Sequence, residues 1–133
     1  MAWLFQWAGN TKAAGAGAET RALAWLVARG LRLVQRNYRV ARGPSARGGE
    51  IDLIMQDSAG TLIFVEVRAR RSAAQGGAAA SITGIKRARI VRTAQHYLAR
   101  LAVVPACRFD VVSIDGDDIE WLPAAFDASS AAC

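Results

Sequence analysis

This chain of 133 residues is poor in several features that define common protein classes. Its two cysteines, Cys107 and Cys133, are too few for a disulfide framework or a cysteine-based zinc site. No apolar run approaches the roughly 20 residues that a membrane-spanning helix needs. Residues 1–8 lack both the basic segment and the long apolar segment of a secretory signal. We therefore expect a reduced, cytoplasmic protein with no membrane partner.

Acidic residues are scarce over most of the chain. The formal net charge is +6, but residues 1–108 hold all 17 Lys and Arg residues and only five acids, which gives +12. Residues 109–133 hold the other six acids and no base, which gives −6. A strongly basic body indicates a polyanionic partner, with nucleic acid favoured over an anionic membrane surface. Fifteen of the 17 bases are Arg, which suits bidentate phosphate contacts, although GC-rich coding would give the same ratio.

The length and an apolar content of 53% predict one compact domain. We place it at residues 15–127, between a flexible or partner-contacting N-terminus at residues 1–14 and a C-terminal tail at residues 128–133. Residues 9–18 are rich in Gly and Ala, and their composition indicates a flexible lead-in.

Hydrophobic periodicity predicts two helices and five strands. The first helix starts at Glu19 and ends at a Gly30 cap, and the second is capped by Ser81 or Thr83 and runs to about Leu101. The expected apolar stripes are Leu23, Leu26 and Val27 on the first helix, and Ile85, Ala88, Val91, Ala94 and Leu98 on the second. The expected strands are residues 31–40, 50–56, 61–68, 109–114 and 119–122. The order α-β-β-β-α-β-β predicts an α/β protein with a mixed sheet flanked by helices.

The second and third strands form a predicted hairpin with two possible registers. A three-residue loop at residues 58–60, with Gly60 in the left-handed conformation, would place Asp52 opposite Glu66 and Glu50 opposite Arg68. A four-residue loop would send the two carboxylates to opposite faces of the sheet. We predict the first register.

Two carboxylates that face each other in an otherwise apolar sheet repel unless a cation lies between them. Asp52, Glu66 and a backbone carbonyl, which we assign to Val67, could hold Mg²⁺ or Mn²⁺, with water and substrate oxygens as the other ligands. Such an ion activates water and polarises a phosphodiester. Glu19 could supply a third carboxylate. The alternative is a solvated hairpin without a metal site, in which Glu50 and Arg68 form a surface ion pair.

Several segments together resemble the YraN-like family of predicted endonucleases. They are Gly15–Glu19, Arg36-Asn37-Tyr38-Arg39, Gly49-Glu50-Ile51-Asp52-Leu53-Ile54, Phe64-Val65-Glu66-Val67-Arg68-Ala69-Arg70, Lys86 and Arg108-Phe109-Asp110-Val111-Val112. Members of this family are similar to archaeal Holliday junction resolvases. The resemblance covers roughly residues 15–127 and implies the restriction-endonuclease-like fold, also written PD-(D/E)xK.

The resemblance also implies roles for individual residues. Asp52 and Glu66 would be metal ligands, Glu19 the acid carried by the first helix, and Glu50 an accessory acid. Lys86 matches the basic residue that opens the second helix of the family.

Two positions depart from the superfamily pattern. Arg68 stands where the superfamily usually has Lys. The pKa of arginine is too high for a general base, so Arg68 could at most orient water or stabilise phosphoryl charge. Residues 43–48 resemble an insertion before the hairpin motif.

Basic residues near this hairpin and on the second helix could hold a duplex through its phosphates. The expected nucleic-acid-binding residues are Arg42, Arg47, Arg70, Arg71, Lys86, Arg87, Arg89 and Arg92. The alternative is an ordinary solvated helix face.

The leading hypothesis is a Mg²⁺- or Mn²⁺-dependent endonuclease that acts on double-stranded or branched DNA, like a Holliday junction resolvase. Glu19, Asp52, Glu66 and Arg68 would be its catalytic residues. Symmetric cutting of two strands would suit a homodimer. The main alternative, favoured by Arg68, is a nucleic-acid-binding module with a nuclease fold and no cleavage. A third is a protein-interaction domain that uses the apolar N-terminus and the acidic C-terminal segment.

Overall fold

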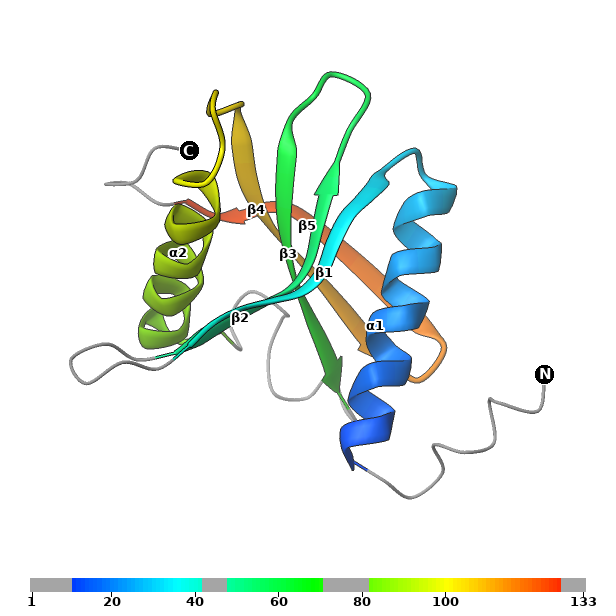
Figure 1. Cartoon of the computed structure of the whole chain (residues 1–133). Coiled ribbons are helices and arrows are strands. Elements are labelled where there is room, and N and C mark those ends of the chain that lie inside the picture. Colours follow the sequence, from blue (N-terminus) through cyan, green and yellow to red (C-terminus); the bar gives the residue numbers. More distant parts are fainter. Residues whose placement is uncertain (1–10, 42–47, 71–81, 128–133) are drawn as a thin grey trace.

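The computed structural model describes residues 11–41, 48–70 and 82–127 (Figure 1). Its elements are α1 (Thr11–Ala28), β1 (Arg32–Val40), β2 (Gly49–Gln56), β3 (Leu62–Arg70), α2 (Gly84–Leu98), β4 (Cys107–Asp115) and β5 (Asp118–Phe126). The predicted mixed α/β class and the order α-β-β-β-α-β-β are therefore confirmed. None of the helices in these segments is long and apolar enough to cross a membrane.

The five strands form one sheet in sequence order, β1-β2-β3-β4-β5. Three neighbouring pairs are antiparallel, and β3 and β4 are parallel, so α2 is the crossover that joins them. Figure 1 shows α2 against one face of the sheet and α1 against the other. The first turns of the two helices lie toward the same end of the sheet, where β2 and β3 diverge.

Each helix covers its own apolar cluster. Under α2, the buried residues include Tyr38, Ile54, Phe64, Phe109 and, from the helix, Ile90, Ala94, Tyr97 and Leu98. Under α1, they include Leu53, Val65, Val112 and, from the helix, Ala18, Ala22 and Leu26. Because the sheet is buried on both faces, neither helix can move without exposing apolar surface.

The first helix begins earlier than its composition predicted. The flexible lead-in predicted at residues 9–18 is wrong for residues 11–18, which are helical. Alanine has the highest helix propensity of all residues, and Ala18 and Ala22 are buried against the sheet. Val27, which was expected on the apolar stripe, is 49% exposed because the buried face follows a spacing of four residues from Ala18 to Leu26.

The second helix is capped as predicted, and its apolar stripe is confirmed in part, because Ala94 and Leu98 are buried. The Thr83 hydroxyl accepts a hydrogen bond from the backbone N–H of Lys86 at 3.1 Å. Ile85 and Ala88, expected on the apolar stripe, are exposed, and Ile85 is 69% exposed. The buried face instead includes Thr93 and Tyr97. A hydropathy pattern misses Thr93 because its hydroxyl donates to the Arg89 carbonyl at 2.8 Å, which satisfies it in the core.

The hairpin adopts the predicted register. Leu53 pairs with Val65 and Gln56 with Leu62. The backbone N–H of Gly60 donates to the Asp57 carbonyl at 3.1 Å, and Gly60 has a φ of +91°. Glycine adopts this left-handed conformation without the steric cost that a β-carbon brings. The three-residue loop therefore sets which strand residues face each other.

Candidate metal and nucleic-acid site

The carboxylates lie where β2 and β3 separate. The paired register of the two strands ends at Leu53 and Val65, and Asp52 and Glu66 are the next residues. Here the backbone N–H of Val67 donates to Asp52 Oδ2 at 2.8 Å. If β2 and β3 stayed paired, a backbone carbonyl of β2 would accept from this N–H. The Asp52 carboxylate accepts from it instead. β2 stays paired with β1 as far as Gly49, so it leaves β3 at Asp52, as Figure 1 shows.

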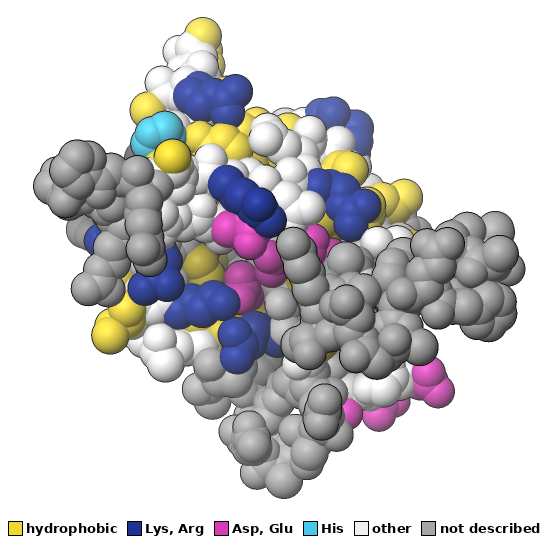
Figure 2. Space-filling model, turned by 60° about the horizontal axis from the view of Figure 1, so that its bottom comes forward, with side chains coloured by type: hydrophobic (Ala, Val, Ile, Leu, Met, Phe, Trp, Pro, Cys, Tyr) yellow, Lys and Arg dark blue, Asp and Glu magenta, His cyan; other side chains and the backbone are white. Residues whose placement is uncertain are grey.

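Two cavities meet at this fork. One has a volume of about 350 Å³, and its lining includes Glu19, Asp52, Glu66, Arg68 and Lys86. The other has a volume of about 300 Å³, and its lining includes Gly49, Glu50, Asp52, Glu66, Lys86 and Arg89. Figure 2 shows a small group of acidic side chains flanked by Lys and Arg side chains on this face of the molecule. The two cavities thus share Asp52, Glu66 and Lys86.

The surroundings of Asp52 disfavour the charged form of its side chain. Burial raises its pKa from the usual 3.8, and repulsion by Glu66 raises it further, to about 8. A hydrogen bond between Glu66 and protonated Asp52 acts in the same direction, while the N–H of Val67 opposes the shift. Glu66 itself is only 6% exposed. The structure therefore brings the two predicted carboxylates into direct contact.

Glu19 reaches the site from α1, as its position predicted. Burial raises the pKa of Glu19, and repulsion by Glu50 and Glu66 adds to the shift. Arg36 of β1 opposes it, and its guanidinium donates to Thr20 Oγ1 at 3.2 Å. Sequence reasoning assigned no role to Arg36, although it lies in a segment that resembles the family. Only the packing of α1 on β1 brings it beside Glu19.

Lys86 contacts the carboxylates directly. Its Nζ lies 2.8 Å from Glu66 Oε2, whereas the nearest guanidinium nitrogen of Arg68 lies 3.8 Å from the same oxygen. Lys86 was predicted to bind nucleic acid, and its contact with Glu66 was missed. Residues 86 and 66 are separated by the crossover, so spacing along the chain carried no sign of this contact.

The predicted place of Glu50 opposite Arg68 is wrong. Glu50 pairs across the other edge of β2, and its Oε2 accepts from Arg39 Nε at 2.8 Å. The prediction extended the hairpin register to the ends of both strands. The strands part at Asp52 instead, so Glu50 forms its ion pair with β1.

The predicted phosphate-binding residues are only partly described by the structure. Arg42, Arg47, Arg71 and the side chain of Arg70 lie outside the described residues. On α2, Arg89 lines the second cavity, and Arg92 is exposed. The Arg87 guanidinium lies over the ring of Phe126, 5.7 Å from its centroid. Lys86 and Arg89 are therefore the α2 bases that the structure brings to the carboxylates.

The donor atoms at the fork fit a hard divalent cation. No group of three or more His, Cys, Asp or Glu side chains in the described segments is arranged to hold a metal ion. The expected ligand set has two carboxylates and one backbone carbonyl, which is typical of Mg²⁺ sites that keep several waters. Asp52 is partly buried and Glu66 is buried, and such a cation would relieve the repulsion between these two carboxylates.

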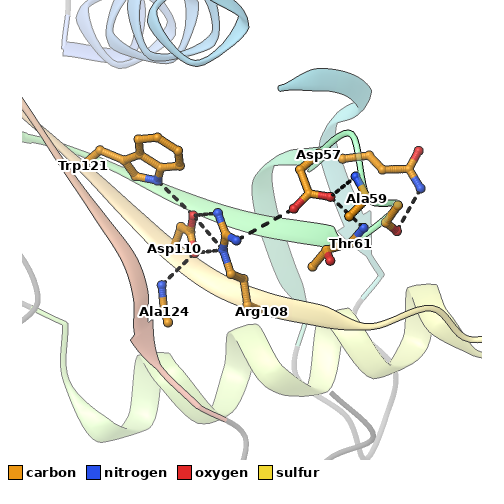
Figure 3. Close-up of polar contacts among 9 residues, drawn as sticks. Asp57, Ala59, Thr61, Arg108, Asp110, Trp121 and Ala124 are labelled. Atoms are coloured by element: carbon orange, nitrogen blue, oxygen red, sulfur yellow. Dashed lines mark hydrogen bonds and ion pairs between the residues drawn. The ribbon is translucent and has the colours of Figure 1, made fainter. Parts of the chain in front are cut away.

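A second buried carboxylate lies on β4 and has a different environment (Figure 3). Asp110 is 0% exposed, and both of its oxygens accept hydrogen bonds. Arg108 Nε, Trp121 Nε1 and the backbone N–H of Ala124 donate to it at 3.0, 2.9 and 2.8 Å. Arg108 also lies 4.0 Å from Asp57 in the hairpin loop. Asp110 and Arg108 lie in a segment that resembles the family, but sequence reasoning assigned them no structural role.

Comparison with known sequences adds family relationships. A model of the uncharacterised protein family UPF0102 matches residues 18–114. A UPF0102 protein of Methylibium petroleiphilum is 63% identical over 120 residues, which cover 90% of this chain and 98% of the relative. A UPF0102 protein of Paracidovorax citrulli is 60% identical over 119 residues, which cover 90% and 86% of the two chains. The matched range includes Glu19, Asp52, Glu66 and Lys86.

Proposed function

The chain belongs to the uncharacterised protein family UPF0102, and we propose that it is a metal-dependent endonuclease that hydrolyses phosphodiester bonds in double-stranded or branched DNA. The observation that carries the proposal is the pairing of Asp52 with Glu66 at a strand fork, where burial and then repulsion by Glu66 raise the pKa of Asp52 to about 8. Strongly perturbed carboxylates in a cavity are typical of functional sites. The basic side chains around them supply the charge that a polyanionic substrate needs.

Asp52, Glu66 and the backbone carbonyl of Val67 would hold Mg²⁺ or Mn²⁺. When bound, the ion would lower the pKa of water and polarise the phosphodiester. The protein's part is to hold the carboxylates in place. The N–H of Val67 fixes one oxygen of Asp52, and Lys86 fixes one oxygen of Glu66, which leaves the other oxygens for the ion.

Glu19 and Arg68 line the cavity on the α1 side of the carboxylates. Burial and like charges raise the pKa of Glu19, and its place in the cavity would bring its carboxyl group close to a phosphate oxygen or to water. Arg68 would stabilise charge on the phosphoryl group. Arg89, at the second cavity, would contact the phosphate backbone beside the scissile bond.

The test is cleavage of four-way-junction, flap and linear duplex DNA with Mg²⁺ or Mn²⁺, by the full chain and by Glu66→Gln. We expect metal-dependent cutting that falls at least about 1,000-fold in Glu66→Gln, because a metal ligand is lost. Size-exclusion chromatography on the same samples reports whether the cutting species is a homodimer.

Two results would contradict this function in different ways. Tight, salt-sensitive DNA binding without cutting would favour the binding module with a nuclease fold. Absence of any DNA binding at low salt would exclude both functions.

A further inference from the structure

Lysine is rare in this chain, and one of the few lysines contacts the carboxylate site. The sequence has two Lys and 15 Arg residues. Lys86 Nζ lies 2.8 Å from Glu66 Oε2, and Lys86 lines both cavities that meet at the fork. Arg68 follows Glu66 by two positions on β3, yet its guanidinium nitrogen is 3.8 Å from this oxygen. Of these two cations, the lysine of α2 is the closer to Glu66.

The position of Lys86 opposes the local preference of the helix. Lys86 is in the first turn of α2, where its backbone N–H donates to the capping hydroxyl of Thr83. The positive end of the helix dipole favours acidic side chains at this point, and the first turn of α2 contains none. A lysine here costs helix stability unless an anion faces it, and Glu66 is that anion. Such conflicts between local preference and sequence are expected at functional positions.

We propose that Lys86 is the resident cation of the site, which shares Glu66 with the divalent ion and donates to the oxygens of the reacting phosphate. This proposal rests on the nuclease function proposed above. An ammonium group has three donors that can address separate acceptors. One can remain on Glu66 while the others face the two cavities. A guanidinium is planar and fixes its donors in one fork, so Arg68 serves the phosphate less adaptably.

If Lys86 has this role, its loss should strengthen metal binding and slow turnover. Lys86 and a divalent cation are both attracted to Glu66 and repel each other, so loss of the ammonium should tighten metal binding. The same loss removes a donor to the charge that develops on the phosphate, so turnover should fall. If Lys86 only anchored α2 to the sheet, its loss would weaken both folding and metal binding.

The test compares Lys86→Met and Lys86→Arg with the wild-type chain. Mn²⁺ affinity is measured without DNA by electron paramagnetic resonance, and kcat and KM are measured on a cleaved DNA at saturating metal. In Lys86→Met we expect about 3- to 10-fold tighter Mn²⁺ binding. We also expect kcat to fall about 10- to 100-fold, with KM changed less than about threefold.

The other variants separate charge from geometry. Lys86→Arg keeps the positive charge, so Mn²⁺ affinity should stay at the wild-type value while kcat falls at least about fivefold. Arg32→Gln is the matched control, since it removes one positive charge at the hairpin end of β1, where Arg32 hydrogen-bonds to Gln56. Both measurements should be unchanged in this control.

The assignment is overturned if Lys86→Met binds Mn²⁺ no more tightly than wild type, or if its kcat stays within about twofold. If Lys86→Met does not fold, a wild-type kcat in Lys86→Arg overturns it instead. A wild-type chain that binds Mn²⁺ but cuts no DNA refutes the nuclease function by itself. In that case, the Mn²⁺ affinity of Lys86→Met still decides whether Lys86 is the resident cation.

Discussion

Asp52 on β2 and Asp110 on β4 are both carboxylates within the sheet, but their environments supply very different numbers of donors. Asp110 is fully buried and accepts from Arg108, Trp121 and the backbone of Ala124. Asp52 is partly buried, accepts from the N–H of Val67 and faces two other acids. The more deeply buried group is therefore the better compensated one. Burial alone therefore does not leave a carboxylate uncompensated; the number of donors and the charge of its neighbours decide this.

The two environments arise from two kinds of sheet irregularity. Between Phe109 and Val111 the register with β5 shifts, and Ala124 in the shifted segment has a φ of +51°. This bulge leaves the backbone N–H of Ala124 without a partner in the strand ladder. The N–H donates to the Asp110 side chain instead, so a side chain within the bulged segment compensates the lost ladder hydrogen bond. At Asp52 the strands separate and bring acids together instead of donors. The irregularity at Asp110 is compensated by hydrogen bonds, whereas the one at Asp52 opens onto two cavities.

The largest effect should come from the compensated carboxylate. Asp110→Ala removes the acceptor of three donors and leaves the Arg108 guanidinium without its main partner, so we expect a loss of about 3–5 kcal/mol in the free energy of unfolding. Chemical denaturation measures it. Trp121→Phe, which removes a single indole donor, should cost only about 1 kcal/mol beyond the change in packing. Equal losses in the two variants would mean that Asp110 acts only through Trp121.

Substitution of Asp52 at the fork should increase the free energy of unfolding at high pH, whereas substitution of Asp110 lowers it. The raised pKa means that native Asp52 keeps its proton up to a pH of about 8, while the unfolded chain loses it near 3.8. The native state then binds the extra proton between these values, so the stability contributed by Asp52 is complete below about pH 4 and is lost as the pH rises through 8. Asp52→Asn should therefore be more stable than wild type at pH 8.5 and nearly equal to it at pH 4. Denaturation across this range tests the difference between the two proteins, and a variant less stable at pH 8.5 would contradict it.

The smallest effect concerns the metal. Mn²⁺ at about ten times its dissociation constant should stabilise the wild-type chain by about 1.4 kcal/mol. At one fixed Mn²⁺ concentration, this stabilisation should be larger at pH 8.5 than at pH 6, because the ion competes with the proton on Asp52. Thermal unfolding with and without Mn²⁺ gives both values. Asp52→Asn should lose this stabilisation and Asp110→Asn should retain it, which separates the two carboxylates by a measurement independent of cleavage.

Local features of the sequence predicted the hairpin and the helix cap well. Gly60 and the alternation of apolar residues set the register, and Thr83 marked the start of α2. Both depend on residues only a few positions apart. The register was enough to predict that Asp52 and Glu66 come together, but not the point at which the strands separate.

Contacts between distant segments could not be predicted in this way. Arg36 meets Glu19 only because α1 packs on β1, and Lys86 meets Glu66 only because the crossover returns α2 to the fork. Part of the buried face of α2 was missed because the sheet covers Thr93, a polar residue whose hydroxyl is satisfied within the helix. Asp110 has the sequence context of an ordinary strand acid, and only the fold surrounds it with Arg108, Trp121 and Ala124. Each of these outcomes depends on tertiary packing.

The acidic residues near the end of the sequence lie on β5, at an edge of the sheet, where they discourage pairing with other chains. In the described part of the protein, β5 is the last strand of the sheet, and Asp118, Glu120 and Pro123 on it are exposed. Edge strands invite pairing with other chains, and charges, proline and bulges discourage it. Two copies brought together through β5 would also repel, because their acids would lie side by side. The negative charge on β5 thus discourages edge-to-edge aggregation, and it is kept apart from the Lys and Arg residues, which all lie in residues 1–108.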